Sequence, residues 1–248
     1  MKLTLAEPRF LKDSVSIISD LITEARFKVT KQSLQFVAMD PANVAMVVFE
    51  LFSTSFTEYL LEEEEDFAVN LSYFKQILKR AGSNDTVTLE LVEDKLKVQL
   101  KGKSTRTFSL AVLESEDREQ KEPSLEFGST ITTPSNVLND TVEDAAVIMA
   151  DSISFVSEPK KITFLAESDL NQVKIELTEA DDVVIQHSGE STIKAKYSIE
   201  YLKKIVASSK LSDTVKLSFA KDYPMKLEYS VVDKLHLSFI LAPRVEND

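Results

Sequence analysis

The feature that most constrains this chain is an internal duplication. Residues Leu71–Leu78 read Leu-Ser-Tyr-Phe-Lys-Gln-Ile-Leu, and 128 residues later Ile199–Val206 read Ile-Glu-Tyr-Leu-Lys-Lys-Ile-Val. The same offset places Asp-Thr-Val-Thr-Leu at 85–89 over Asp-Thr-Val-Lys-Leu at 213–217. In a chain of 248 residues this spacing indicates two copies of one folding unit.

Each copy is predicted to contain two helices among several strands. Nearer the N-terminus an offset of 126 places residues 26–29 over 152–155. Apolar residues recur at helical spacing over 10–25 and over 135–150, and the repeated segment described above has the same period. Alternating polar and apolar residues predict strands, among them 27–37, 44–52, 87–91, 96–100, 173–177 and 225–231.

This pattern predicts an α+β fold of two similar domains, each built from antiparallel sheets and two helices. The helices lie between groups of strands instead of following every strand, which disfavours a doubly wound α/β fold. Alternation within the strands indicates sheets with one face on the core. Residues 114–126 are polar and without an apolar period, so we expect a linker between domains at 1–113 and 127–248.

Composition excludes several classes of site. The chain has no Cys, so it forms no disulfide and has no thiolate ligand or nucleophile. Its two His, His187 and His236, have no metal-ligand spacing, and its four Gly are too scattered to cradle a phosphate. No apolar run approaches the about 20 residues that cross a bilayer. We therefore predict no cofactor and no metal, and a hydrolase that uses carboxylates is the weakest of the functional alternatives.

Cations gather on the polar faces of the duplicated helices. Helical geometry places Lys75 and Lys79 opposite the apolar stripe of the first helix, with Arg80 at its edge, and Lys203 and Lys204 similarly in the second copy. Such a face is either simply solvated or contacts phosphates. In a chain of formal charge −12, a positive strip on both copies would hold a duplex without reading its sequence.

Two strand-like segments, 105–113 and 171–178, lie one in each copy. A bare sheet edge is an aggregation hazard, so native edges are protected or pair with another chain. On sequence alone, these segments are either inside the sheets of one subunit or edges that join two subunits.

Segments spread over the whole chain carry a family resemblance. They include Ala-Met-Asp-Pro at 38–41, Ile-Leu-Lys-Arg-Ala-Gly at 77–82, Asp-Tyr-Pro at 222–224 and Leu-Ala-Pro-Arg at 241–244. Their order and spacing across two copies resemble the DNA sliding clamp family, proliferating cell nuclear antigen, most closely its archaeal members.

The resemblance implies a ring of three subunits whose helices surround duplex DNA and whose sheets form the outside. Such a clamp has no catalytic activity; it is a DNA polymerase processivity factor. A clamp loader opens it, and a DNA polymerase, a flap nuclease and a DNA ligase dock through short peptides. Homotrimers and heterotrimers of paralogous subunits both occur, so a specialised or checkpoint-type subunit is the alternative. The expected location is the cytoplasm of an archaeon, at the nucleoid, or the nucleus of a eukaryote.

The resemblance also assigns residues to three sites. The residues that would contact DNA are Lys12, Lys75, Lys79, Arg80, Lys203 and Lys204. The peptide pocket would comprise Met39, Asn43, Val44, Pro224, Leu241, Ala242 and Pro243, with Pro123 and Leu125 at its rim. Subunits would join through Thr107, Ser109, Ala111, Val173, Ile175 and Leu177.

Two stretches depart from the pattern of the family. The predicted helix at 135–150 carries Asp140, Glu143 and Asp144 but neither Lys nor Arg, although basic residues are usual there. The linker is crowded with charged residues at 119–122, where apolar residues often form the floor of the pocket.

Overall fold

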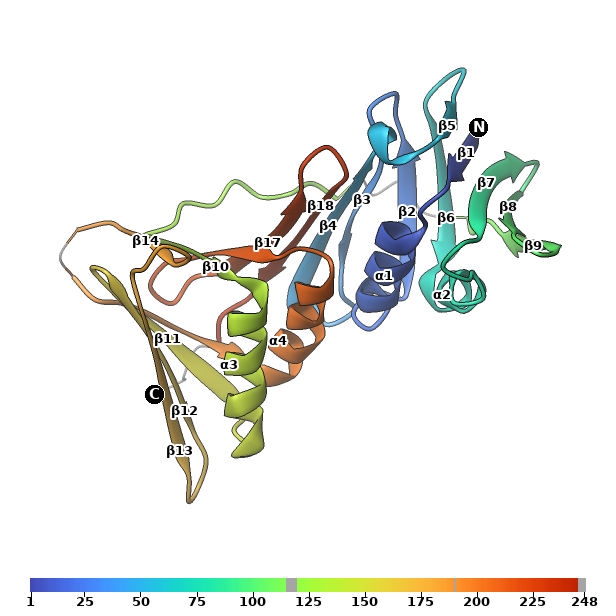
Figure 1. Ribbon diagram of the computed structural model, residues 1–248. Coiled ribbons are helices and arrows are strands. Elements are labelled where there is room, and N and C mark those ends of the chain that lie inside the picture. Colours follow the sequence, from blue (N-terminus) through green and yellow to red (C-terminus); the bar gives the residue numbers. More distant parts are fainter. Residues whose placement is uncertain (115–119, 190, 245–248) are drawn as a thin grey trace. The chain divides into compact units, whose positions relative to one another are not determined.

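A computed structural model describes residues 1–114, 120–189 and 191–244 of the chain. The chain folds into two compact units, Met1–Glu122 with Val231–Leu237, and Pro123–Ser230 with Ser238–Asp248 (Figure 1). Of the predicted linker at 114–126, residues 115–119 lie outside the described residues, as do residues 190 and 245–248 of the predicted second domain.

The first unit contains two antiparallel sheets and two helices. Its strand orders are β5-β1-β7-β8-β9 and β4-β3-β2-β6. The elements are β1 (Lys2–Leu5), α1 (Arg9–Ile18), β2 (Glu24–Val29), β3 (Ser33–Met39), β4 (Ala45–Phe52), the 3-10 turn η1 (Ser53–Ser55), β5 (Glu58–Leu60), β6 (Glu65–Asn70), α2 (Leu71–Leu78), β7 (Thr86–Val92), β8 (Lys95–Lys101) and β9 (Thr105–Ala111).

The second unit repeats this plan. Its strand orders are β13-β12-β11-β15 and β14-β10-β16-β17-β18, and β18 begins in residues assigned to the first unit. The elements are β10 (Ser129–Pro134), α3 (Ser135–Val147), β11 (Ser152–Glu158), β12 (Lys161–Glu167), β13 (Gln172–Thr178), β14 (Val184–His187), β15 (Ile193–Ser198), α4 (Ile199–Val206), the 3-10 turn η2 (Ala207–Lys210), β16 (Thr214–Phe219), β17 (Met225–Val231) and β18 (Leu235–Leu241).

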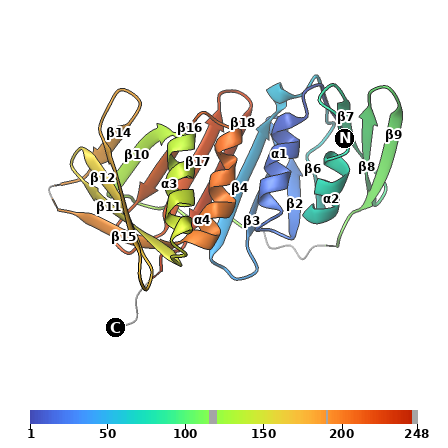
Figure 2. The same cartoon turned by 60° about the horizontal axis from the view of Figure 1, so that its bottom comes forward.

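Aromatic packing anchors α2 on the strands of the first unit. The ring of Phe27 on β2 lies 4.9 Å from that of Phe36 on β3 and 6.1 Å from that of Phe74 on α2. Leu71 and Leu78 of α2 are also fully buried. Figure 2 shows α1 and α2 side by side in front of the strands. Because one face of α2 is buried in this way, the opposite face must point to solvent.

The second unit has a matching aromatic cluster. The ring of Phe155 on β11 lies 5.0 Å from that of Phe164 on β12 and 6.0 Å from that of Phe219 on β16. Phe155 and Phe164 follow Phe27 and Phe36 by 128 residues. The offset is therefore 128 here too, and the predicted offset of 126 for residues 26–29 is wrong. A sequence match of four residues with no identities could not fix this register.

Two further predictions need correction. The helix predicted at 10–25 ends at Ile18, and β2 begins at Glu24. Leu21 and Ile22 are buried, so they extended the apolar stripe, but they lie in the connecting turn. The strand predicted at 27–37 is two strands, because the hydroxyl of Thr30 accepts the backbone N–H of Ser33 at 3.2 Å and closes a turn. Among the described residues, no helix has the length and apolar character to cross a membrane.

One buried carboxylate organises the turn between β3 and β4. Asp40 is 5% exposed, and its Oδ1 accepts the backbone N–H groups of Val44 at 2.6 Å and Ala45 at 2.7 Å. Its Oδ2 accepts the N–H of Ala42 at 3.2 Å. Asn43 adopts a φ of 56°, a left-handed conformation that Asn tolerates better than most residues. The carboxylate therefore satisfies a loop that would otherwise carry unpaired backbone donors.

Replacing Asp40 with Ala should destabilise the first unit by about 2–3 kcal/mol, because partly buried N–H groups lose their charged acceptor. Urea unfolding followed by circular dichroism measures this as a lower midpoint for the unit. Glu62→Ala, which removes the same charge from an exposed position, is the matched control. Equal midpoints for the two variants would contradict this role of Asp40.

Candidate nucleic-acid and partner-binding surfaces

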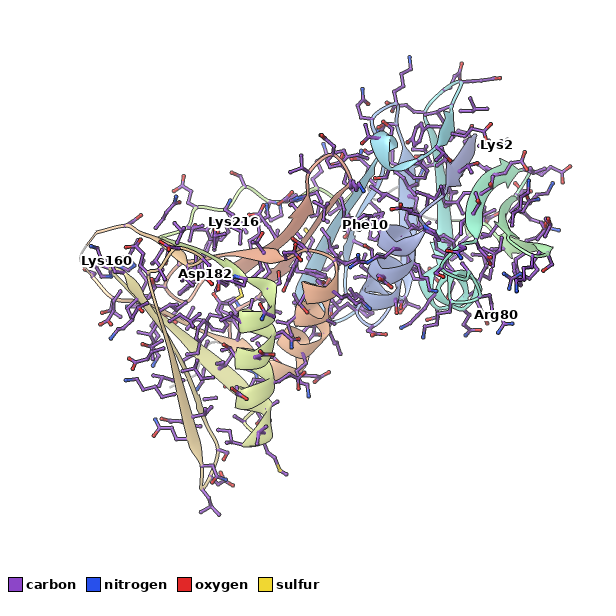
Figure 3. The ribbon with its side chains drawn as sticks, in the orientation of Figure 1. Lys2, Phe10, Arg80, Lys160, Asp182 and Lys216 are labelled. Carbon is purple, nitrogen blue, oxygen red and sulfur yellow. The ribbon has the colours of Figure 1, made fainter. Side chains whose placement is uncertain are left out.

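In the first unit, two exposed cations stand directly after the last residue of α2. The helix begins after Asn70, whose side chain accepts the backbone N–H of Tyr73 at 3.1 Å. Lys79 and Arg80 follow the last helical turn, and both are exposed. Figure 3 places Arg80 at the α2 end of this unit. Within the described ranges, the structure gives neither side chain an ion pair.

Lys12 on α1 and Lys75 on α2 already have hydrogen-bond or ion-pair partners. The ammonium of Lys12 donates to the carbonyl of Ala81 at 2.8 Å. Lys75 forms a 2.7 Å ion pair with Asp20, and its side chain is only 18% exposed. These two residues therefore offer less free charge than Lys79 and Arg80, a difference that helical spacing alone could not reveal.

In the second unit, the cations of α4 face carboxylates. Lys203 lies 3.5 Å from Glu143 of α3, and Lys204 lies 3.0 Å from Glu200 one helical turn earlier. The ammonium of Lys204 also lies 5.3 Å from the centre of the Tyr201 ring. Exposed ion pairs are worth at most about 1 kcal/mol, so an approaching phosphate can compete for these lysines.

The two helix faces therefore differ in charge. Asp140 and Asp144 of α3 are exposed beside Glu143, as the acidic composition of this helix indicated. On α3 and α4 the carboxylates outnumber the lysines, whereas Lys79 and Arg80 at the end of α2 form no ion pair with a described residue. A polyanion would contact the first unit more strongly.

The residues expected to bind a peptide fall into two groups, one in each unit. In the first unit, Met39 and Val44 are half-buried and Asn43 is exposed, all at the turn that Asp40 holds. This turn presents apolar surface on a backbone fixed by hydrogen bonds.

The part in the second unit is organised by β15. The hydroxyl of Tyr197 donates to the carbonyl of Tyr223 at 2.7 Å, which fixes the loop before Pro224. The backbone N–H of Arg244 donates to the carbonyl of Lys196 at 2.7 Å, which holds the segment after β18. Burial raises the pKa of Tyr197 far above its ordinary value, so this phenol stays a donor.

The apolar residues of this part differ in exposure. Pro224, Ala242, Pro243 and Leu125 are half-buried, and Pro123 is exposed. Leu241, in contrast, is fully buried. Leu241 therefore supports this surface from below and offers a ligand no contact area.

Both predicted edge strands lie at the edges of their sheets. β9 ends the first five-stranded sheet, and β13 ends the four-stranded sheet of the second unit. Each strand alternates exposed side chains with half-buried ones. The half-buried side chains include Phe108 and Leu110 on β9, and Val173, Ile175 and Leu177 on β13.

The register shows which backbone groups face the open edge. The N–H of Val112 donates to Asp94, and that of Gly102 to the carbonyl of Ser104, so the hydrogen-bonded pairs of β8 and β9 are the even-numbered ones. Thr107, Ser109 and Ala111 therefore direct their backbone groups outward.

On β13 the outward groups belong to other residues than those expected. Glu179 donates to Lys160 and Ser168 to Asn171, which makes Val173, Ile175 and Leu177 the residues bonded to β12. Their side chains can still pack against a neighbour, but the open backbone groups belong to the residues between them, including Lys174 and Glu176.

Sequence reasoning missed three structural residues of these surfaces. Asp40 stood inside a recognised segment, but its acceptor role depends on the folded turn. Tyr197 and Lys196 are ordinary strand residues until the loops that they hold are in place. Among the described residues, no group of three or more His, Asp or Glu is arranged to hold a metal ion.

Family models cover nearly the entire chain. The model for the N-terminal domain of proliferating cell nuclear antigen matches residues 1–119, and that for its C-terminal domain matches residues 121–244. The structure also resembles the crystal structure of proliferating cell nuclear antigen from Thermococcus kodakaraensis, with a TM-score of 0.90 and 31% identity over 98% of this chain and 99% of that one.

Curated relatives agree. A protein named DNA polymerase sliding clamp from Nanoarchaeum equitans is 37% identical over 98% of this chain and 99% of its own length. One of the same name from Thermococcus gammatolerans is 34% identical over 94% of both chains. The chain therefore belongs to the proliferating cell nuclear antigen family of DNA sliding clamps, which are scaffolds without catalytic activity of their own.

Proposed function

We propose that three subunits close into a ring around duplex DNA, with the polar faces of α1 to α4 toward the duplex. The chain is a sliding clamp by family, and the observation that supports this orientation is the pair of exposed cations, Lys79 and Arg80, on the helix face of an otherwise acidic protein. Contacts of this kind go to phosphates, so the clamp holds DNA without sequence preference and can slide. Lys12, Lys75, Lys203 and Lys204 contribute secondarily.

Changing Lys79 and Arg80 together to Ala should weaken retention on circular duplex DNA. For every phosphate that is no longer bound, the slope of log affinity against log salt should fall by about 0.9. Salt-dependent retention on nicked circles measures this, and primer extension measures the accompanying loss of polymerase processivity.

The matched control for this double variant is Lys31→Ala, which removes an exposed cation from the turn between β2 and β3. Conversely, Glu143→Gln should release Lys203 and strengthen retention. If the double variant and the control were retained equally, the helix face would be no more than a solvated surface.

We also propose that short peptides of a DNA polymerase, a flap nuclease, a DNA ligase and the clamp loader dock at Met39, Asn43 and Val44 and at Pro224, Ala242 and Pro243. Pro123 and Leu125 border this surface and Leu241 supports it. Half-buried apolar side chains on hydrogen-bonded loops are suited to receive an aromatic anchor, and such anchors dominate peptide affinity.

Val44→Asp and Pro243→Asp should each weaken binding of a peptide with Gln and aromatic anchors by at least thirtyfold, about 2 kcal/mol. Calorimetry with one such peptide measures the change. Val232→Asp, an equal substitution at a residue that is 85% exposed, should leave affinity intact. Unchanged affinity in Val44→Asp and Pro243→Asp would place the peptide elsewhere.

Ring closure is proposed to pair β9 of one subunit with β13 of the next. Such a head-to-tail contact closes a ring when its rotation permits. The outward backbone of Thr107, Ser109 and Ala111 meets that of the residues between Val173, Ile175 and Leu177, and the half-buried apolar side chains become covered.

Proline at an outward position should remove one intersubunit donor and leave the ladder within the subunit intact. Ser109→Pro and Lys174→Pro should therefore shift native mass from trimer toward monomer, whereas circular dichroism stays that of the parent. Glu62→Pro, in the loop before β6, is the control. Trimers that persist in both folded edge variants would exclude this interface.

A second candidate is a subunit that assembles only with paralogous clamps, as a specialised or checkpoint-type ring would. The acidic face of α3 favours it, because that face supplies no cation to a duplex and a partner subunit could supply more. Native mass of the isolated chain separates the two: a trimer supports the homotrimer, and a monomer supports the mixed ring. We place the protein with the DNA, in the cytoplasm of an archaeal cell, or in the nucleus if the source is a eukaryote.

A further inference from the structure

A row of lysines occupies the face of the five-stranded sheet that points away from the core of the first unit. On β8, Leu96, Val98 and Leu100 are fully buried, so the alternate residues point to the other face. Lys97 is half-buried on that face, and Lys101 is exposed.

The row continues into the turn between β8 and β9, where Lys103 is exposed. With a rise of about 3.3 Å per residue, Lys97 and Lys101 stand about 13 Å apart along the strand. In the described part of the chain, the structure gives Lys97, Lys101 and Lys103 no ion pair. The proposed encirclement of DNA uses none of these three.

A polar hollow of about 570 Å³ lies on the same face. Hydroxyl and amide groups from three strands and the turn before β7 line it beside Lys101, from Thr4, Asn84, Thr86, Thr88 and Gln99. The hydroxyl of Thr4 already lies 3.0 Å from Glu58 and 3.1 Å from the hydroxyl of Thr88. Asn84, Thr86 and Gln99 can donate to phosphate oxygens, as Ser, Thr, Asn and Gln do in nucleic-acid complexes. Figure 3 places Lys2, which also lines the hollow, at the end of the first unit remote from Arg80.

The carboxylates at the hollow, including Glu58 in its lining, already have partners. Glu58 forms a 2.8 Å ion pair with Lys2 and accepts the hydroxyl of Thr4 at 3.0 Å, and these bonds lower its pKa. Asp85 pairs with Arg106. Glu90 is the cross-strand neighbour of Lys97 and offsets part of its charge. The surplus positive charge is therefore concentrated at Lys101 and Lys103.

We propose that this surface, the outward face of β7 and β8 with the β8–β9 turn, binds a single strand of nucleic acid by its phosphodiester backbone. The lining of the hollow contains no aromatic, Leu or Met side chain, which leaves a peptide without an apolar anchor. The absence of an aromatic platform in this lining also leaves bases unstacked, so binding is indifferent to sequence. Cations in single file along one β-strand suit one file of phosphates.

This inference goes beyond encirclement, because the surface is on the sheet and not on the helices. A strand held here would be one that leaves the duplex, such as a displaced end or an unpaired template. The clamp would then grip duplex by its helices and single strand by its outward sheet face.

The test compares K97Q/K101Q/K103Q with a charge-matched variant, K31Q/K160Q/K221Q, whose lysines are exposed in three separate turns. Anisotropy of a fluorescent 20-nucleotide oligothymidylate, titrated at several salt concentrations, gives the affinity and its salt slope. With three fewer cations on the protein surface, the slope of log affinity against log salt should fall by about 2. The affinity at low salt should fall at least tenfold. The charge-matched variant should bind as the parent does.

Further measurements separate this inference from the proposed function. Retention on circular duplex DNA should be the same in the parent and in K97Q/K101Q/K103Q, and thermal unfolding should show that both are folded. An unchanged salt slope, an equal weakening in the charge-matched variant, or a matching drop in circle retention would each overturn the proposal. So would lysine-dependent binding of polyglutamate by a parent that does not bind the oligonucleotide. If the parent were not retained on circular DNA, that result would count against encirclement but would not bear on single-strand binding by the sheet face.

Discussion

The rest of the structure depends on the buried core of each unit, where one face of every helix and a cluster of aromatic rings are removed from solvent. Phe27 and Phe155 occupy equivalent places in the two units, and each contacts a second Phe on the neighbouring strand at about 5 Å. Because this packing requires one apolar face on every helix, it decides which residues are left for solvent. The location of Lys79 and Arg80 on an exposed face is therefore a consequence of core packing.

The division of each helix into a buried face and an exposed face explains why the sequence predicted the fold class and the duplicated helices. Helical period and strand alternation report burial, and burial is what the core imposes. The same signals failed where burial continues through a change of backbone: Leu21 and Ile22 are buried beyond the end of α1, and Thr30 and Ser33 are buried in the turn that divides the predicted strand. The offset between residues 26–29 and their counterparts in the second copy could be fixed only from the positions of the aromatic rings.

The candidate sites show the same limit of sequence reasoning. Periodicity identifies a side chain that must point outward, but it cannot identify the side chain's partner. Lys75 and Lys79 share a helix face, yet only Lys75 forms an ion pair with Asp20. That pair joins residues 55 positions apart, so helical periodicity could not identify it. Leu241 illustrates the converse, since a residue at the end of a strand can be a support and not a surface. Strand register likewise could not be predicted: the open backbone groups of β13 belong to the residues between Val173, Ile175 and Leu177.

Net charge proves a poor guide to what such a chain contacts. Twelve surplus negative charges would repel DNA if they were evenly spread, but the Debye length at physiological salt is only about 8 Å, so a phosphate responds mainly to nearby side chains. The acid-rich helix α3 and the lysines of β8 belong to different units, and each sets the potential over its own surroundings. An acidic body with two local cationic surfaces is therefore consistent with sliding, because attraction to phosphates is confined to those surfaces.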